Sequence, residues 1–396
     1  MLLAVGGIVA CGPAETDPGI ASPLTFLGDV IINPVPAVSG DPEIGGLSSL
    51  YHVGDSVYYA ISDDRGRTGR PARFYVLDIH VADRDTVGGG DSGRSGTVEG
   101  HPGEGTAAGG GSNRVTASVL GWEEIFAASG EPLEPLTYDL EGMVVLDANF
   151  FISSEGDVAR GVEPFVAVFG PDRAMMETLA LPPGYVPNAD RSSGVRDNLA
   201  FEALGITPDA RYLFAATESA LEQDGAVATP DAGTMARILR FDRDHGVFDA
   251  QFAYPIDAVH DSSPSPIGLE VNGVAELIAL SGDHLLVLER SFVAGVIRFH
   301  SIKLFDVCLA DATDVSGMGS LTDAEFVPAS KRFIADLADL VPHLDNVEGM
   351  SFGPSLPSGE RTLIFVSDNN FAPERQITQV LAFSVDPNAL QGCSSR

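Results

Sequence analysis

The sequence predicts an all-β protein built as a five-bladed β-propeller, and three observations support this. The chain has 396 residues, of which 44 are glycine and 26 proline, and 44% are hydrophobic, which indicates many short strands joined by turns. One pattern of two apolar strands recurs five times along the chain. Each copy is followed by further strand-like runs, giving roughly four strands per unit, as in a propeller blade. A six-bladed ring and a β-sandwich are the alternative folds, and the repeat period fits the sandwich poorly.

The five units begin near residues 46, 141, 202, 276 and 348. Each opens with an apolar strand led by Gly or Glu, turns, and continues into a second apolar strand that ends in a carboxylate. The outer strands are expected at residues 73–81 and 115–121, 165–169 and 175–181, 237–242 and 248–254, and 296–305. Four strands per unit then account for most of the chain.

The last unit shows only three strands, the third at residues 379–385. We expect residues 25–32 to supply its outer strand, because this closes the ring without an exposed sheet edge. A short helix is expected at residues 330–340, and the long stretch around it keeps the six-bladed alternative open. The Gly/Ser-rich tract at residues 88–113 cannot bury enough apolar surface to fold, so it is expected to be a disordered insertion.

The N-terminus resembles a bacterial lipoprotein signal. Residues 1–10 form an apolar run too short to span a membrane, and Cys11 follows directly. This predicts a signal and tether at residues 1–19, a propeller domain at 20–390, and an exported protein that is periplasmic, at the outer membrane through a lipid on Cys11, or secreted. A chance apolar stretch is the alternative. Lipidation of Cys11 would leave Cys308 and Cys393 for a disulfide, the alternative being two unpaired thiols.

The charge balance excludes one class of partner. The chain carries 23 Lys and Arg against 56 Asp and Glu, a formal net charge of −33. Such a surplus repels a phosphate backbone, so nucleic-acid binding is not expected. We expect a monomer that binds a small anionic substrate or ligand, although adaptation to salt would also account for the acidity.

The repeat gathers acidic side chains at one rim of the predicted ring. Because the first and second strands of each unit are antiparallel, the start of one lies beside the end of the other. The acids at these positions, with one neighbouring amide, are Asp63, Asp64, Glu141, Glu155, Glu202, Glu218, Glu276, Glu289, Glu348, Asp368 and Asn369. Crowded carboxylates need cations, and Ca²⁺ prefers carboxylate and amide oxygens, so these residues are the predicted calcium ligands. A network of ion pairs that only fixes the rim is the alternative.

Four residues are candidates for catalysis. Glu141 and Glu202 begin first strands and would face the channel as metal ligands or as the general base. Arg65 and Arg290 directly follow second-strand acids and could hold an anionic group through the guanidinium fork. The sequence contains no Gly-x-Ser-x-Gly elbow, Walker loop or His-Glu-x-x-His motif, so any catalysis would be metal-assisted.

Taken in order along the chain, these motifs resemble the phytase-like family of exported bacterial proteins, also described as having esterase-like activity. The motifs span roughly residues 20–386 and are Gly45-Gly46-Leu47-Ser48, Ile61-Ser62-Asp63-Asp64-Arg65, Asp139-Leu140-Glu141-Gly142, Ile152-Ser153-Ser154-Glu155, Asn198-Leu199-Ala200-Phe201-Glu202, Leu286-Val287-Leu288-Glu289-Arg290, Asn346-Val347-Glu348-Gly349 and Val366-Ser367-Asp368-Asn369-Asn370-Phe371. The sequence departs from the family's Glu-Gly pattern at Ala203.

The resemblance implies hydrolysis of phosphomonoesters or other esters in a calcium-loaded propeller. Two further functions stay open on the sequence alone. One is a lipid-anchored propeller that binds an anionic or carbohydrate ligand without catalysis, and the other is a lactonase or arylesterase.

Overall fold

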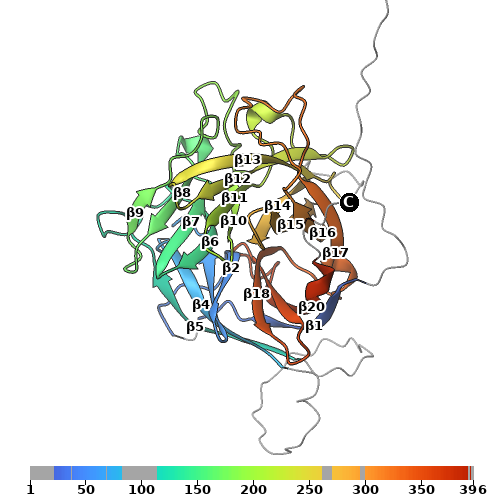
Figure 1. Cartoon of the computed structure of the whole chain (residues 1–396). Coiled ribbons are helices and arrows are strands. Elements are labelled where there is room, and N and C mark those ends of the chain that lie inside the picture. Colours follow the sequence, from blue (N-terminus) through green and yellow to red (C-terminus); the bar gives the residue numbers. More distant parts are fainter. Residues whose placement is uncertain are drawn as a thin grey trace, which may run out of the picture.

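The computed structural model describes residues 22–36, 38–67, 69–82, 114–260, 270–294, 299–390 and 393. These residues form five four-stranded antiparallel sheets around a common axis (Figure 1). The five-bladed β-propeller is therefore confirmed, and the six-bladed and sandwich alternatives are wrong. In the described part of the chain the only helices are short 3₁₀ turns, namely η1 (Val158–Arg160), η2 (Glu222–Asp224), η3 (Leu337–Asp339) and η4 (Pro387–Ala389).

The blades follow one another along the chain, and each runs from the axis outward. Blade 1 contains β2 (Leu47–Gly54), β3 (Val57–Ser62), β4 (Arg73–Val81) and β5 (Val115–Glu124), and blade 2 contains β6 (Leu140–Leu146), β7 (Asn149–Ser154), β8 (Phe165–Phe169) and β9 (Met175–Thr178). Blade 3 contains β10 (Phe201–Ile206), β11 (Tyr212–Thr217), β12 (Thr234–Asp242) and β13 (Val247–Ile256), and blade 4 contains β14 (Glu270–Ala279), β15 (His284–Val293), β16 (Phe299–Cys308) and β17 (Ser330–Asp336). Blade 5 contains β18 (Val347–Ser355), β19 (Arg361–Ser367) and β20 (Thr378–Val385).

The ring closes through the N-terminal strand, as predicted. Strand β1 (Leu24–Ile32) pairs antiparallel with β20, from Leu24 opposite Val385 to Ile32 opposite Thr378. The sheet order of blade 5 is β1-β20-β19-β18, so both ends of the propeller chain meet in one sheet. The edge that β20 would otherwise expose is therefore covered by backbone hydrogen bonds.

The helix predicted at residues 330–340 is wrong. Residues Ser330–Asp336 form the outer strand β17, and only the turn η3 follows. Strand β16 offers an unpaired edge, and Phe333 packs edge-on against Phe305 of that strand with ring centroids 5.9 Å apart. Tertiary pairing therefore overrides the local preference for a helix.

The hydrophobic core lies between neighbouring blades. The interface of blades 3 and 4, for example, buries Phe214, Ile238, Val274, Leu285 and Phe305. The inner strands contact one another in the ring order β2, β6, β10, β14, β18 and back to β2. The start of each inner strand is thereby brought to a shared space on the axis.

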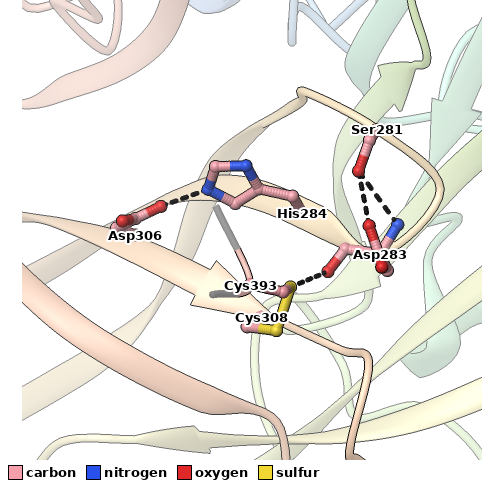
Figure 2. Close-up of a disulfide and its surroundings, with 6 residues drawn as sticks. All are labelled: Ser281, Asp283, His284, Asp306, Cys308 and Cys393. Atoms are coloured by element: carbon pink, nitrogen blue, oxygen red, sulfur yellow. Dashed lines mark hydrogen bonds and ion pairs between the residues drawn. A yellow bond between two sulfur atoms is a disulfide. The ribbon is translucent and has the colours of Figure 1, made fainter. Parts of the chain in front are cut away.

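The predicted disulfide is present. Cys308, at the end of β16, is bonded to Cys393, 85 residues later, with their Cα atoms 5.2 Å apart (Figure 2). Arg332 of β17 also donates a hydrogen bond of 2.6 Å to the carbonyl of Ala389. The segment after β20 is therefore fixed to blade 4.

Three predictions fall outside the described residues: the signal and tether at 1–19, the lipid site at Cys11, and the insertion at 88–113. Among the residues that are described, we find no helix with the length and apolar character needed to cross a membrane.

Candidate functional site

The site is built from a β-bulge that recurs in all five inner strands, at the start of the strand in blades 1, 2, 3 and 5 and in the middle of β14 in blade 4. The register shifts by an extra residue after Leu47, Leu140, Phe201, Val274 and Val347. A bulged residue is left unpaired, so its side chain can be turned out of the sheet. The residues that follow the shift are Ser48, Glu141, Glu202, Ala275 and Glu348, one from each blade in order.

A second set of five residues comes from the second strand of each blade, at the position that lies beside the bulge of the inner strand. In four blades the residue just beyond the last pair on the second strand is Asp63, Glu155, Glu218 or Asp368. In blade 4 the two strands pair further, and the equivalent residue, Arg290, lies opposite Gly273. In the other four blades the backbone N–H of this residue donates to a carbonyl just before the inner strand, as Asp63 does to Gly46 at 3.0 Å. Blade 4 differs from the other blades, because it has an arginine at the position where they have a carboxylate.

Eight of these ten residues, all except Ser48 and Ala275, line one cavity of about 360 Å³ on the axis. Its charged lining comprises nine carboxylates, from Asp63, Asp64, Asp139, Glu141, Glu155, Glu202, Glu218, Glu348 and Asp368, and three guanidiniums, from Arg65, Arg67 and Arg290. Asn198, Asn370 and Phe371 complete the lining. The formal charge of the lining is therefore strongly negative.

Arg290 lies among the acids and neutralises part of this charge. Its Nη2 lies 3.3 Å from Glu218 Oε1 and 3.9 Å from Glu202 Oε1, and its Nη1 lies 3.3 Å from Glu348 Oε1. Nη1 also donates to Asn346 Oδ1 at 3.1 Å. Arg290 thus acts as a fixed internal cation for blades 3 to 5, and most of its guanidinium is already engaged by the chain.

Arg65 serves the other side of the cavity. It forms an ion pair with Asp139, donates to Asn198 Oδ1 at 2.6 Å, and lies 3.8 Å from Asp157. Asp64 faces away from this group, because its Oδ2 pairs with the fully buried Arg73 at 2.9 Å. The predicted ligand Asp64 therefore has its charge balanced by the protein itself.

Burial and mutual repulsion raise the pKa values of the remaining acids. Burial raises the pKa of Glu155 to about 8, with a further contribution from the charge of Glu218. Burial raises the pKa of Asp63 to about 7, helped by the charges of Glu348 and Asp64. Burial and neighbouring carboxylates also hold the pKa values of Glu141 and Glu202 well above their usual range. Without an added cation, these acids cannot all be ionised at neutral pH.

Three predicted ligands do not belong to the site. Glu276 pairs with Leu288 one position past the bulge, so Ala275 takes the place that a Glu takes in blades 2, 3 and 5. The Glu276 carboxylate instead accepts from the Ser49 hydroxyl at 2.7 Å and the Leu277 N–H at 3.0 Å.

Glu289 is displaced by the same one-residue shift in blade 4. It precedes Arg290 and points between blades 3 and 4, where it accepts from the Tyr254 hydroxyl at 2.7 Å. Asn369 is fully buried behind the cavity and donates from Nδ2 to the carbonyl of Ile44 at 3.1 Å. Its neighbour Asn370 lines the cavity in its place.

The structure also adds residues to the site that the sequence prediction left out. Asp139 lies two positions before Glu141, and the alternation of a strand would have placed both on one side. Arg67 lines the cavity, is exposed, and forms no hydrogen bond or ion pair within the described part of the chain. It follows Arg65 at the same two-residue spacing, so that spacing could have indicated it.

The donor set fits a hard divalent cation. Oxygen atoms of Glu155, Glu202 and Glu218 can all lie within 4.8 Å of one another, and so can those of Asp139, Glu141 and Glu155. Asp63 Oδ1 is buried without a hydrogen-bond donor among the described residues. Gly46, in the left-handed region at φ 66°, makes room for this oxygen, since a Cβ there would lie 2.1 Å from it. Hard divalent cations bind clustered carboxylate oxygens of this kind.

Comparison with known proteins identifies a family over most of the chain. Residues 42–371 match the model of the phytase-like family, described as having the esterase-like activity of phytase. None of the curated proteins matches this sequence. Among solved structures, the Dos1 propeller is 10% identical, with coverage of 87% of this chain and 67% of that chain and a TM-score of 0.29. A protein of unknown function from Dyadobacter fermentans is 9% identical, with coverage of 92% and 100% and a TM-score of 0.36.

Proposed function

The chain belongs to the phytase-like family, and from this premise we propose that its axial cavity hydrolyses phosphate or related esters with the help of calcium. The observation that carries the proposal is the convergence of bulge acids and second-strand acids from neighbouring blades in one cavity. Three of their oxygens, from Glu155, Glu202 and Glu218, can lie within 4.8 Å of one another. Three arginines line the same cavity, and the exposed Arg67 gives it a means to attract an anionic ester.

The cation would be held by acids of the cavity lining, where carboxylates outnumber the arginines that face them. These are Glu155, Glu202 and Glu218 on one side, with Asp139, Glu141 and Asp63 on the other. When bound, a divalent cation supplies positive charge that polarises an ester oxygen.

The chain's own residues account for substrate attraction and proton transfer. Arg67 is exposed at the cavity and carries an unpaired guanidinium within the described residues, so it is suited to meet an incoming anion. A general base needs a pKa near the working pH, and burial raises the pKa of Glu218 to about 7, although Arg290 opposes this. The carboxylates that face the cavity can therefore accept a proton from water at neutral pH.

We also place the protein outside the cytoplasm. The Cys308–Cys393 disulfide supports this, because such bonds persist in oxidising compartments. The apolar run before Cys11 supports export as well. Cell fractionation and metabolic labelling with a fatty acid would test the location and the lipid.

The test is hydrolysis by the purified protein, measured with calcium and with a chelator, against panels of phosphate esters, carboxyl esters and lactones. Calcium-dependent turnover of a phosphate or carboxyl ester is expected. Glu202→Gln should lower both bound calcium and turnover, because it removes one charge from the cluster. Glu177→Gln is the matched control, since Glu177 is exposed on β9 far from the cavity lining.

Two results would overturn the proposal. Binding of calcium and anions without turnover of any ester would establish the non-catalytic binding propeller instead. Turnover that is confined to lactones would favour the lactonase alternative.

A further inference from the structure

A second charged cluster lies between blades 3 and 4, outside the cavity lining. The chain has two lysines, Lys303 and Lys331, and both lie in this cluster. They surround Asp257, in the segment after β13, and Glu289 of β15. We call these four residues the lysine cluster.

Lys331 is held against two carboxylates at once. Its Nζ lies 2.7 Å from Asp257 Oδ1 and 2.5 Å from Glu289 Oε1. Its side chain is 11% exposed, and that of Glu289 is fully buried. The amine also lies 4.1 Å from the ring centroid of Phe305 and 5.3 Å from that of Tyr254. A nucleophile and a carboxyl carbon are thus fixed side by side, with the amine between two aromatic rings and the Asp257 side chain 23% exposed.

The two carboxylates differ in how they are held. Glu289 accepts hydrogen bonds from the Tyr254 hydroxyl at 2.7 Å, the backbone N–H of Asp257 at 3.1 Å and Asn272 Nδ2 at 3.0 Å. These three donors fix the position of the Glu289 carboxylate beside the Lys331 amine. The Asp257 carboxylate meets only the two lysines among the described residues, with Lys303 Nζ 3.6 Å from Oδ2. A cation on that oxygen draws electrons from the carboxyl carbon and makes it the better electrophile.

We propose that Lys331 and Asp257 form an intramolecular isopeptide bond, with Glu289 acting as the proton carrier. The Lys331 ammonium gives one proton to Glu289, and the freed amine attacks Cγ of Asp257. One C–N bond forms and one C–O bond breaks. The departing oxygen takes two protons that came from the nitrogen and leaves as one water molecule, so the reaction needs no oxidant, reductant or cofactor.

The bond would join the end of blade 3 to the outer strand of blade 4. Blade 4 is already tied to the segment after β20 by the disulfide Cys308–Cys393. The isopeptide would add a link on the other side of this blade that no reductant can open.

The test is a tryptic map of the folded full-length protein, denatured and reduced after incubation. An isopeptide predicts a branched peptide in which residues 244–290 are joined to residues 304–332, with a mass lower than the sum of the two by one water. Trypsin should not cut after Lys331 in this species, because the lysine is acylated. Recovery of an unlinked peptide 304–331 from the folded protein, with no branched peptide, would overturn the proposal.

Variants separate the chemistry from folding. Lys331→Arg keeps a cation between the carboxylates but cannot form this bond, so the branched peptide should be lost completely while the melting curve stays cooperative. Asp257→Ala and Glu289→Gln should also lose it, whereas Lys303→Arg, the matched control at the other lysine, should retain it. A link that persists in Asp257→Ala, or a link from Lys331 to Asn272 with loss of ammonia, would overturn the assignment of Asp257 as the partner.

Discussion

The cavity and the lysine cluster are two groups of acids with different charge balance, the first strongly negative and the second neutral. In the lysine cluster, before a bond joins Lys331 to Asp257, two carboxylates meet two ammonium groups, and Glu289 has three further hydrogen-bond donors. In the cavity nine carboxylates meet three guanidiniums. A buried charge is costly unless it is paired. The charges of the lysine cluster are all paired within the chain, whereas those of the cavity are not. The comparison shows that the chain itself does not neutralise all the acids of the cavity, and the predictions below test whether cations from solution do so.

The largest expected loss of stability follows removal of the Lys331 cation from the lysine cluster. Relative to Lys331→Arg, which keeps a cation and cannot form the proposed bond, Lys331→Met leaves Glu289 buried without its charge partner, which typically costs about 3–5 kcal/mol. Urea unfolding should show this loss equally with calcium and with chelator, because no site for an added cation replaces the lysine. Full recovery of stability by calcium would mean that the two clusters do not differ as proposed.

The matched change in the cavity is Arg290→Met. It also removes a cation from a group of carboxylates, here Glu202, Glu218 and Glu348. We expect a loss of stability in chelator that calcium largely restores, as measured by the same unfolding curves. A loss that is independent of calcium would place Arg290 with the structural ion pairs.

The next effect is stabilisation of the unaltered protein by calcium. A ligand that binds only the native state adds RT ln(1 + [L]/Kd) to the free energy of unfolding, or about 2.7 kcal/mol at a hundredfold excess over Kd. Thermal melts with calcium and after thorough chelation should differ accordingly. An unchanged melting temperature would show that calcium does not bind the cavity of the native protein.

Stability of the metal-free protein should also fall as the pH rises. Burial raises the pKa of Glu155 to about 8 from an ordinary value of 4.5, so between these values the folded state holds more protons than the unfolded state. Stability then decreases with pH across this window, because deprotonation of the unfolded chain is favoured. The melting temperature in chelator should decline as the pH rises from the lower to the upper of these two pKa values. Calcium should make this decline smaller. A rise instead would show that these acids are neutralised within the fold.

The recurrence along the sequence was sufficient to predict the fold and the place of the site. The repeat positions, the alternating strands and the missing fourth strand of blade 5 together indicated five blades and closure by β1. The positions of Glu141, Glu202 and Glu348 at the cavity follow from the same repeat.

The predictions that were wrong depend on single-residue register, which the repeat alone cannot fix. Glu276 and Glu289 each lie one position away from the residue that faces the cavity, because blade 4 pairs Val274 with Glu289 and bulges at Ala275. A shift of one residue turns a strand side chain to the opposite face, so an acid that looks equivalent in sequence points elsewhere. The strand β17 was missed for a different reason, since its partner β16 is distant in sequence from the signals that suggested a helix.

The smallest expected effect concerns Arg67, which is the exposed arginine of the cavity lining. Arg65 and Arg290 are engaged by acids of the chain, so Arg67 has the guanidinium most available to an anionic ester. Arg67→Ala should raise KM for a charged substrate by up to about fivefold, in line with the roughly 0.2–1 kcal/mol of an exposed ion pair. Neither kcat nor calcium-dependent stability should change, because the residue touches neither the acid cluster nor the core. The matched substitution of Arg375, an exposed arginine outside the cavity lining, should leave KM as it is. If Arg67→Ala instead lowered kcat and calcium binding together, the opening of the cavity would belong to the cation site itself, and the division between attraction of substrate and binding of metal would have to be redrawn.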